Sequence, residues 1–106
     1  MRVIKSTDED FSKLLSENQK VIVKYYADWC GQCKLFAPKF NRLSGDESYK
    51  GIAFLDVNAE KNPNARKTAG VDNLPFFAIF KNGQLAEGTA TSKEEKVVEM
   101  LQNLNG

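Results

Sequence analysis

Apolar and polar positions follow one another along the chain in blocks that predict strands separated by helices. Residues 21–27 form an apolar run rich in β-branched and aromatic side chains, which is typical of a strand covered on both faces. Shortly after it, Phe36, Phe40 and Leu43 recur at helical spacing. A buried strand followed closely by a helix with one apolar face is therefore expected in the first half of the chain.

Turn residues mark the remaining elements. Asn82-Gly83 separates residues 76–81 from residues 84–86 and is typical of a β-hairpin. Asn62-Pro63 is typical of a helix start, and Gly70 of the end of that helix. The predicted strands are residues 2–5, 21–27, 52–57, 76–81 and 84–86, with a helix after each of the first three and another after the last.

The first and last helices carry a further signal at their starts. Ser6 precedes Glu9 by three residues, and Ser92 precedes Glu95 by the same spacing, which predicts two capping boxes. The resulting order is βαβαβαββα. Strands separated by helices predict parallel neighbours, and the hairpin predicts one antiparallel pair. We therefore expect a single α/β domain over residues 1–106, with a mixed sheet and helices on both faces.

Composition removes several classes of function. Fifteen basic and 14 acidic residues give a formal net charge of +1, so no overall field favours nucleic acid or an anionic membrane as a partner. The chain has no histidine, which excludes Cys–His and Ser–His nucleophile pairs, an imidazole general base and histidine metal ligands. No apolar run has the length of a signal peptide or a membrane span. We expect a soluble, cytoplasmic protein.

The two cysteines, Cys30 and Cys33, carry the candidate chemistry. Two thiolates cannot complete a four-thiolate zinc site, so no metal is expected and a redox pair remains. Cys30 falls where a strand ends and a helix begins, so unpaired backbone N–H groups and the helix dipole should lower the pKa of its thiol. Cys33 follows one turn later, close enough to attack a mixed disulfide formed at Cys30.

These positions predict that Cys30 attacks and that Cys33 resolves. Gly31 is expected to leave the approach to Cys30 open, and Lys34 to add a positive charge in the first helical turn. A C-x-x-C motif alone also allows a plainer interpretation, in which both cysteines pack as small apolar side chains.

The segment YADWCGQCKLFAP, residues 26–38, resembles the active-site segment of the thioredoxin family. The resemblance extends from about residue 3 to residue 104, with Asn62-Pro63, residues 74–83 and the last helix in register. It implies a thioredoxin fold, with a five-stranded mixed sheet flanked by four helices. It also implies that Pro75 is cis and packs against the cysteine pair, while the Leu74 backbone pairs with an extended substrate segment. The implied client surface comprises Trp29, Gly31, Gln32, Leu74, Pro75 and Phe76.

The activity that this resemblance implies is thiol–disulfide oxidoreduction in cell redox homeostasis and electron transport. The expected partners are disulfide-containing client proteins and a thioredoxin-reductase-type or other dithiol electron donor, and the expected state is monomeric. No Gly-x-Gly-x-x-Gly fingerprint is present, so no flavin or nicotinamide cofactor is expected. Two alternatives stay open: a more oxidising or isomerase-like relative, and a non-catalytic binding subunit.

The sequence departs from the family pattern at positions that bear on redox tuning. Most thioredoxins have proline at the position of Gln32, and its absence frees a backbone N–H, which predicts a better stabilised Cys30 thiolate and a more oxidising pair. The family's buried aspartate and its lysine partner are exchanged in sign, as Lys24 and Asp56.

We expect Lys24 and Asp56 to form an ion pair beneath the cysteines, the alternative being that Lys24 extends to the surface. Lys24 with a lowered pKa, Asp56 or water could then accept the proton of Cys33, and the sequence does not choose among them. Two further expectations concern the docking edge: Gly88 is the nearest candidate for the family's docking glycine, and Phe76 should add apolar bulk there.

Overall fold

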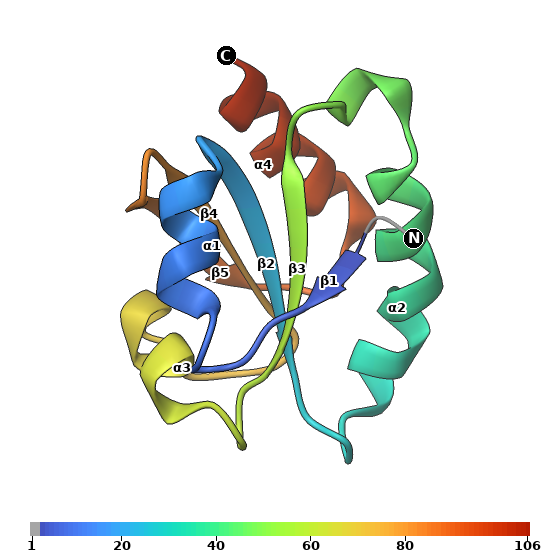
Figure 1. Cartoon of the computed structure of the whole chain (residues 1–106). Helices are drawn as coiled ribbons and strands as arrows, with labels where there is room; N and C mark the ends of the chain where they lie inside the picture. Colours follow the sequence, from blue (N-terminus) through green and yellow to red (C-terminus); the bar gives the residue numbers. More distant parts are fainter. Residues whose placement is uncertain (1–2) are drawn as a thin grey trace.

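Five strands form one sheet that helices cover on both faces (Figure 1). A computed structural model describes residues 3–106, so Arg2, expected in the first strand, lies outside the described residues. The elements are β1 Val3–Lys5, α1 Phe11–Glu17, β2 Lys20–Tyr26, α2 Gly31–Ser44, a 3₁₀ turn η1 Glu47–Tyr49, β3 Ala53–Asn58, α3 Pro63–Ala69, β4 Phe76–Lys81, β5 Gln84–Ala90 and α4 Glu94–Asn105. The predicted order βαβαβαββα is confirmed, with η1 added between α2 and β3.

The strands lie in the order β1-β3-β2-β4-β5. β1, β3 and β2 are parallel, whereas β4 is antiparallel to both β2 and β5, so the prediction of a single antiparallel pair is wrong. The length of α3 explains the difference. Its seven residues rise only about 10 Å, roughly half the length of a six-residue strand, so the chain enters β4 from the end at which β3 leaves the sheet.

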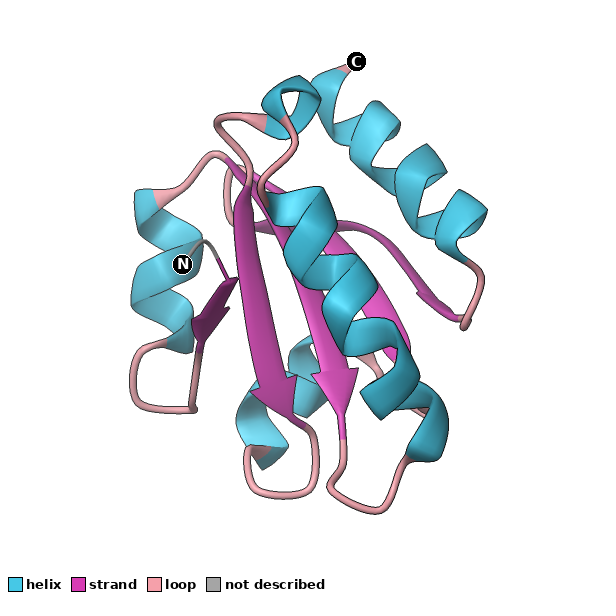
Figure 2. Ribbon diagram, turned by 90° about the vertical axis from the view of Figure 1, so that its right-hand side faces the viewer, coloured by secondary structure: helices cyan, strands magenta, loops and turns pink. Residues whose placement is uncertain are grey.

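Each face of the sheet is covered by one pair of helices (Figures 1 and 2). α1 and α3 cover one face, where Phe11, Leu15 and Ala65 are buried against strand residues. α2 and α4 cover the other face, where Phe36 and Leu101 belong to a second buried cluster. The central strand β2 contributes to both clusters, which explains its continuous apolar sequence. Within residues 3–106, no helix is long and apolar enough to cross a membrane.

Both predicted capping boxes are wrong. α1 begins at Phe11 after Asp10, whose Oδ1 accepts hydrogen bonds from the Ser6 hydroxyl and the Thr7 N–H. Ser6 lies too early to cap the helix because its own N–H still pairs with the Asp56 carbonyl, continuing the β1 pairing. At α4, which follows Lys93, the Thr91 hydroxyl oxygen accepts the Lys93 N–H, and Ser92 makes no side-chain cap.

Asp8, which is distant in sequence, caps the N-terminus of α3. Its carboxylate accepts the Ala65 N–H at 2.8 Å and the Asn64 N–H at 3.1 Å. Its own N–H donates to Asn62 Oδ1 at 2.9 Å, which explains why Asn62 occupies the predicted N-cap position without capping the helix through its side chain. The β1–α1 segment and α3 are thereby joined, with a carboxylate at the positive end of a short helix.

We predict that Asp8→Ala lowers the free energy of unfolding by about 1–2 kcal/mol, because two helix N–H groups lose their acceptor. Urea denaturation measures the loss. Glu9→Ala is the matched control, since the exposed Glu9 neighbours Asp8 and makes only a backbone hydrogen bond, to Thr7 Oγ1. Equal losses in the two variants would contradict the assignment of Asp8 as the α3 cap.

Candidate active site

Cys30 and Cys33 form a disulfide at the junction of β2 and α2. Cys30 is the N-cap of the 14-residue α2, and its Sγ accepts the Cys33 N–H at 3.1 Å. Both residues are almost completely buried and pack with Ala27 and the partly buried Leu74. The attacking position predicted for Cys30 is therefore at the helix terminus, where backbone N–H groups face the sulfur.

The first turn of α2 leaves space beside the disulfide. A Cβ built on Gly31 would meet nothing within 4 Å, in keeping with the open approach predicted there. Gln32 and Lys34 are exposed on the same turn. Gly31, Gln32 and Lys34 thus lie together around the cysteines, as predicted. A side chain at position 31 would meet no close contact.

The Leu74-Pro75 peptide bond is cis, as the resemblance implied. Pro75 lines a groove of about 220 Å³ together with Gln32 and Leu74, so three predicted client-surface residues meet there. The Leu74 N–H donates to Asn73 Oδ1, and the Pro75 carbonyl accepts the Thr91 N–H. Residues that line this groove without having been predicted are Asn73, Ala90, Thr91 and Ser92.

Phe76 and Gly88 do not lie where the sequence placed them. The Phe76 side chain is only 6% exposed and packs edge-to-face with Tyr25, so the expectation that it adds bulk to the docking edge is wrong. Gly88 does not line the groove beside Pro75; Ala90 and Thr91 do. A Cβ on Gly88 would lie 3.0 Å from the Phe76 ring, so the absence of a side chain at 88 accommodates that ring.

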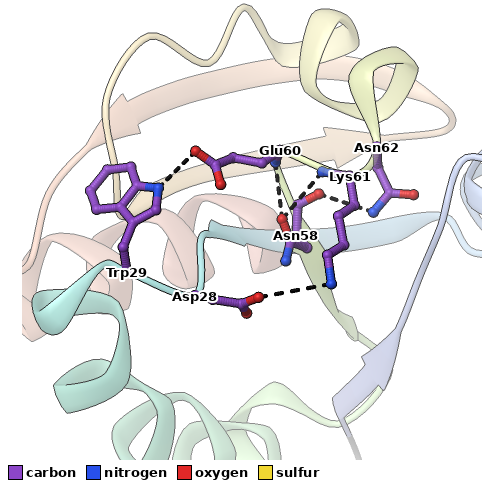
Figure 3. Close-up of polar contacts among 6 residues, drawn as sticks. All are labelled: Asp28, Trp29, Asn58, Glu60, Lys61 and Asn62. Carbon is purple, nitrogen blue, oxygen red and sulfur yellow. Dashed lines mark hydrogen bonds and ion pairs between the residues drawn. The ribbon is translucent and has the colours of Figure 1, made fainter.

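Trp29 is held on the surface beside the disulfide by the loop that follows β3. The indole is 68% exposed, and its Nε1 donates to Glu60 Oε2 at 2.7 Å (Figure 3). A second contact joins Asp28 and Lys61 at 3.8 Å, but both side chains are largely exposed, so it contributes little. The Trp29–Glu60 hydrogen bond thus joins the two loops, beside a backbone hydrogen bond in which the Ala59 N–H donates to the Tyr26 carbonyl at 2.8 Å.

Asn58 organises the loop that carries Glu60. Its buried side-chain oxygen accepts the N–H groups of Glu60 at 3.0 Å and Lys61 at 3.3 Å, while its carbonyl accepts Asn62 Nδ2 (Figure 3). Sequence reasoning missed both Asn58 and Glu60. An asparagine directly after a buried strand is a signal of an Asx-type turn and could have indicated this loop.

We predict that Glu60→Ala increases the mobility of the Trp29 indole, because its hydrogen-bond acceptor is lost. Trp29 is the sole tryptophan of the chain, so the anisotropy of its fluorescence reports this site directly and should fall. Glu95→Ala removes an exposed carboxylate from α4 and serves as the control. Unchanged anisotropy in Glu60→Ala would show that the hydrogen bond does not restrain the ring.

The ion pair expected between Lys24 and Asp56 is present. Lys24 Nζ lies 3.4 Å from Asp56 Oδ1, and the side chains are 4% and 16% exposed, so the alternative in which Lys24 extends to the surface is wrong. The strand register explains the pair, because Lys24 of β2 lies opposite Asp56 of β3, and Lys5 of β1 flanks Asp56 on its other side. Lys5, Lys24, Asp56 and Cys33 all line one cavity of about 240 Å³.

The two members of this pair have different surroundings. Lys24 Nζ lies over the rings of Phe40 at 5.6 Å and Tyr26 at 5.7 Å, which favours the charged ammonium. Burial raises the pKa of Asp56 above its usual value, although the charges of Lys24 and Lys5 act in the opposite direction. Asp56 Oδ1 is buried, and Lys24 Nζ at 3.4 Å is its partner in the ion pair.

Comparison with known proteins agrees with this geometry. The family model described as Thioredoxin matches residues 2–103. Thioredoxin-T of Drosophila melanogaster is 30% identical over 99 residues, which are 93% of this chain and 62% of that protein. Thioredoxin-1 of Schizosaccharomyces pombe is 33% identical over 82 residues, which are 77% of this chain and 78% of that protein.

Solved structures show the same fold. Thioredoxin f from spinach chloroplast, in its long form, superposes with a TM-score of 0.90 at 25% identity, covering 99% of this chain and 88% of that one. Thioredoxin f2, solved in complex with ferredoxin:thioredoxin reductase, also superposes with a TM-score of 0.90, at 24% identity. The match covers 99% of this chain and 96% of that one.

A C-x-x-C disulfide at a strand-to-helix junction, next to a cis proline, defines a thiol–disulfide oxidoreductase. The chain belongs to the thioredoxin family, whose fold it has, and is a protein-disulfide reductase of that type.

Proposed function

We propose that this chain carries electron pairs from a dithiol donor to the disulfides of client proteins, with Cys30 attacking and Cys33 resolving. The observation that carries the proposal is the Cys30–Cys33 disulfide at the N-terminus of α2, beside the groove formed by Leu74 and Pro75. The helix terminus favours a thiolate at Cys30, and the groove offers a place for the polypeptide that bears the client disulfide.

The reaction consists of two thiol–disulfide exchanges. The Cys30 thiolate attacks one sulfur of the client disulfide, the client S–S bond breaks, and the second client sulfur leaves as a thiolate that takes up a proton. Cys33 then loses its proton and attacks the Cys30 sulfur of the mixed disulfide. This step closes the Cys30–Cys33 bond and releases the client sulfur that Cys30 had attacked, as a thiolate that takes up a proton, so the client gains two electrons and the chain becomes oxidised.

Substitution of the cysteines one at a time tests these roles. Cys30→Ser should abolish reduction of a protein disulfide such as that of insulin, because no attacking thiolate remains. Cys33→Ser should lose turnover but retain attack, so that a covalent mixed disulfide with the client accumulates at Cys30 and is seen by mass spectrometry. Turnover by Cys30→Ser, or trapping through Cys33 in that variant, would contradict the proposed order.

We further propose that Asp56 accepts the proton of Cys33. Cys33 and Asp56 line the same cavity, so a proton could pass between them through water in that cavity. Lys24 is a poor acceptor because an ammonium has no free lone pair. The ionised Asp56 carboxylate has free lone pairs, and burial raises its pKa, which suits a general base.

A matched pair of variants tests the role of Asp56. Asp56→Asn alone would leave Lys24 buried without its counter-ion, so both proteins should carry Lys24→Met, and only one should also carry Asp56→Asn. Rapid-mixing measurement of mixed-disulfide resolution near neutral pH should show a rate at least about tenfold lower in the double variant. Lys24→Met removes a charge that lowers the pKa of Asp56, so the pKa should rise further in this variant, with Lys5 as the remaining nearby cation. The rate in Lys24→Met should therefore fall as the pH drops through that raised pKa, and the double variant should lack that step. Identical rates and pH profiles would leave water as the acceptor.

A second candidate, a more oxidising relative, is favoured by Gln32. Gln32 is exposed at the N-terminus of α2 and retains the backbone N–H that proline would lack. If that N–H stabilises the Cys30 thiolate, Gln32→Pro should make the reduction potential about 30 mV more negative, the equivalent of roughly one hydrogen bond. Redox titration against glutathione measures the change, and equal potentials in the two proteins would remove the argument for this candidate.

The partners and location that we propose are a thioredoxin-reductase-type donor, protein clients, the cytoplasm and a monomeric state. A reductase partner is supported by the neighbour thioredoxin f2, which was solved with ferredoxin:thioredoxin reductase. Relatives occur in more than one compartment, for example Thioredoxin-3, mitochondrial, of Saccharomyces cerevisiae. Cell fractionation and light scattering test location and oligomeric state separately from activity.

A further inference from the structure

A second groove lies along α3, next to the residue that holds Trp29. It has a volume of about 530 Å³, and its lining residues are Ala59, Glu60, Pro63, Arg66, Lys67, Gly70 and Val71. Ala59 and Val71 are buried and form apolar parts of this lining. The α3 groove, defined by these seven residues, is separate from the smaller groove beside Pro75, with which it shares no residue.

Two cationic side chains line the α3 groove. Arg66 Nε donates to the Val71 carbonyl at 3.2 Å, which fixes the guanidinium at the edge of the groove. Lys67 is exposed and takes part in none of the ion pairs formed within residues 3–106. The one carboxylate in the lining, Glu60, accepts a hydrogen bond from the neutral indole of Trp29 and keeps its negative charge on that side of the groove. The other two charges of the groove, Arg66 and Lys67, are positive and form no ion pair within residues 3–106.

Two lining residues of the α3 groove, Glu60 and Val71, lie close in contact or in sequence to residues of the redox site. Glu60 contacts Trp29, which directly precedes Cys30. Val71 lies three residues before Leu74, which packs against the disulfide. A polypeptide that passes over Trp29 from Cys30 therefore meets Glu60, which lines the groove.

We propose that the α3 groove binds the acidic flank of a client polypeptide, so that clients with Asp or Glu a few residues from the reactive disulfide are preferred. This inference rests on the proposed function, because it names the substrate class of the same reaction. Apolar parts of the flank contact Ala59 and Val71, while a carboxylate meets Arg66 and Lys67. The net charge of the whole chain is only +1, so an acidic preference would come from the charges in the groove and not from the overall charge of the protein.

Three synthetic disulfide peptides that differ only in two flanking residues test the preference. The flanks are Glu-Glu, Gln-Gln and Lys-Lys, and single-turnover reduction by the pre-reduced protein gives a second-order rate constant for each. We expect the Glu-Glu peptide to react about fivefold faster than the Gln-Gln peptide at low salt, and the Lys-Lys peptide to react more slowly than both. The ratios should shrink towards one near 1 M salt, where the Debye length is about 3 Å.

Substitutions of Lys67 and Arg66 test whether these groove residues cause the difference between the peptide rates. Lys67→Gln should reduce the Glu-Glu to Gln-Gln ratio to about half, and Lys67→Glu should bring it to one or below, with the rate on the Gln-Gln peptide unchanged. Lys50→Gln is the matched control, since Lys50 is exposed next to η1, at the opposite end of the sheet from the disulfide (Figure 1). Arg66→Lys keeps the charge and should keep most of the ratio.

The outcomes separate this inference from the proposed function. Equal rates on the Glu-Glu and Gln-Gln peptides in the unsubstituted protein, or a ratio that survives Lys67→Glu, would overturn the acidic preference while the reductase activity stands. Failure to reduce the Gln-Gln peptide at all would overturn the proposed function and this inference with it. A ratio that falls equally in Lys50→Gln would assign the effect to overall charge and reject the groove.

Discussion

The structure depends on a single junction, at which the central strand β2 ends and α2 begins. β2 is buried on both faces, so its apolar sequence fixes its position in the sheet, and α2 must then start within a few residues of its end. Cys30 occupies the N-cap at that point. The sulfur is therefore placed by the packing of β2 and α2 in the core, and the backbone N–H of Cys33 is supplied to it by the helix itself.

This constraint explains why the central features of fold and site could be predicted from the sequence. The apolar run before the cysteines, the helical spacing of Phe36 and Phe40, and the Asn82-Gly83 turn are local signals, and each depends on neighbouring residues alone. Asn82 and Gly83 have the positive φ angles that the turn requires. The Lys24–Asp56 pair followed from the resemblance, which places these residues at the positions of the family's buried pair, and from the argument that a lysine within a buried strand needs a counter-ion.

What could not be predicted depends on contacts between segments distant in sequence. Asp8 caps a helix more than 50 residues later, and no local pattern distinguishes it from Glu9, which makes no such contact. Phe76 follows the cis proline and was placed on the surface, but its direction is decided by β4, whose residues alternate between the two faces of the sheet. Gly88 then takes its role from Phe76, because the ring covers the position where a Cβ would lie.

Lys24 and Asp56 are direct neighbours on parallel strands, and each lies in surroundings that suit its charge. The residue at position 24 lies over Phe40 and Tyr26, whose rings favour a cation, whereas the residue at position 56 also faces Lys5. Lysine on β2 and aspartate on β3 therefore suit the environment that this chain provides, and Asp56 lines the same cavity as Cys33.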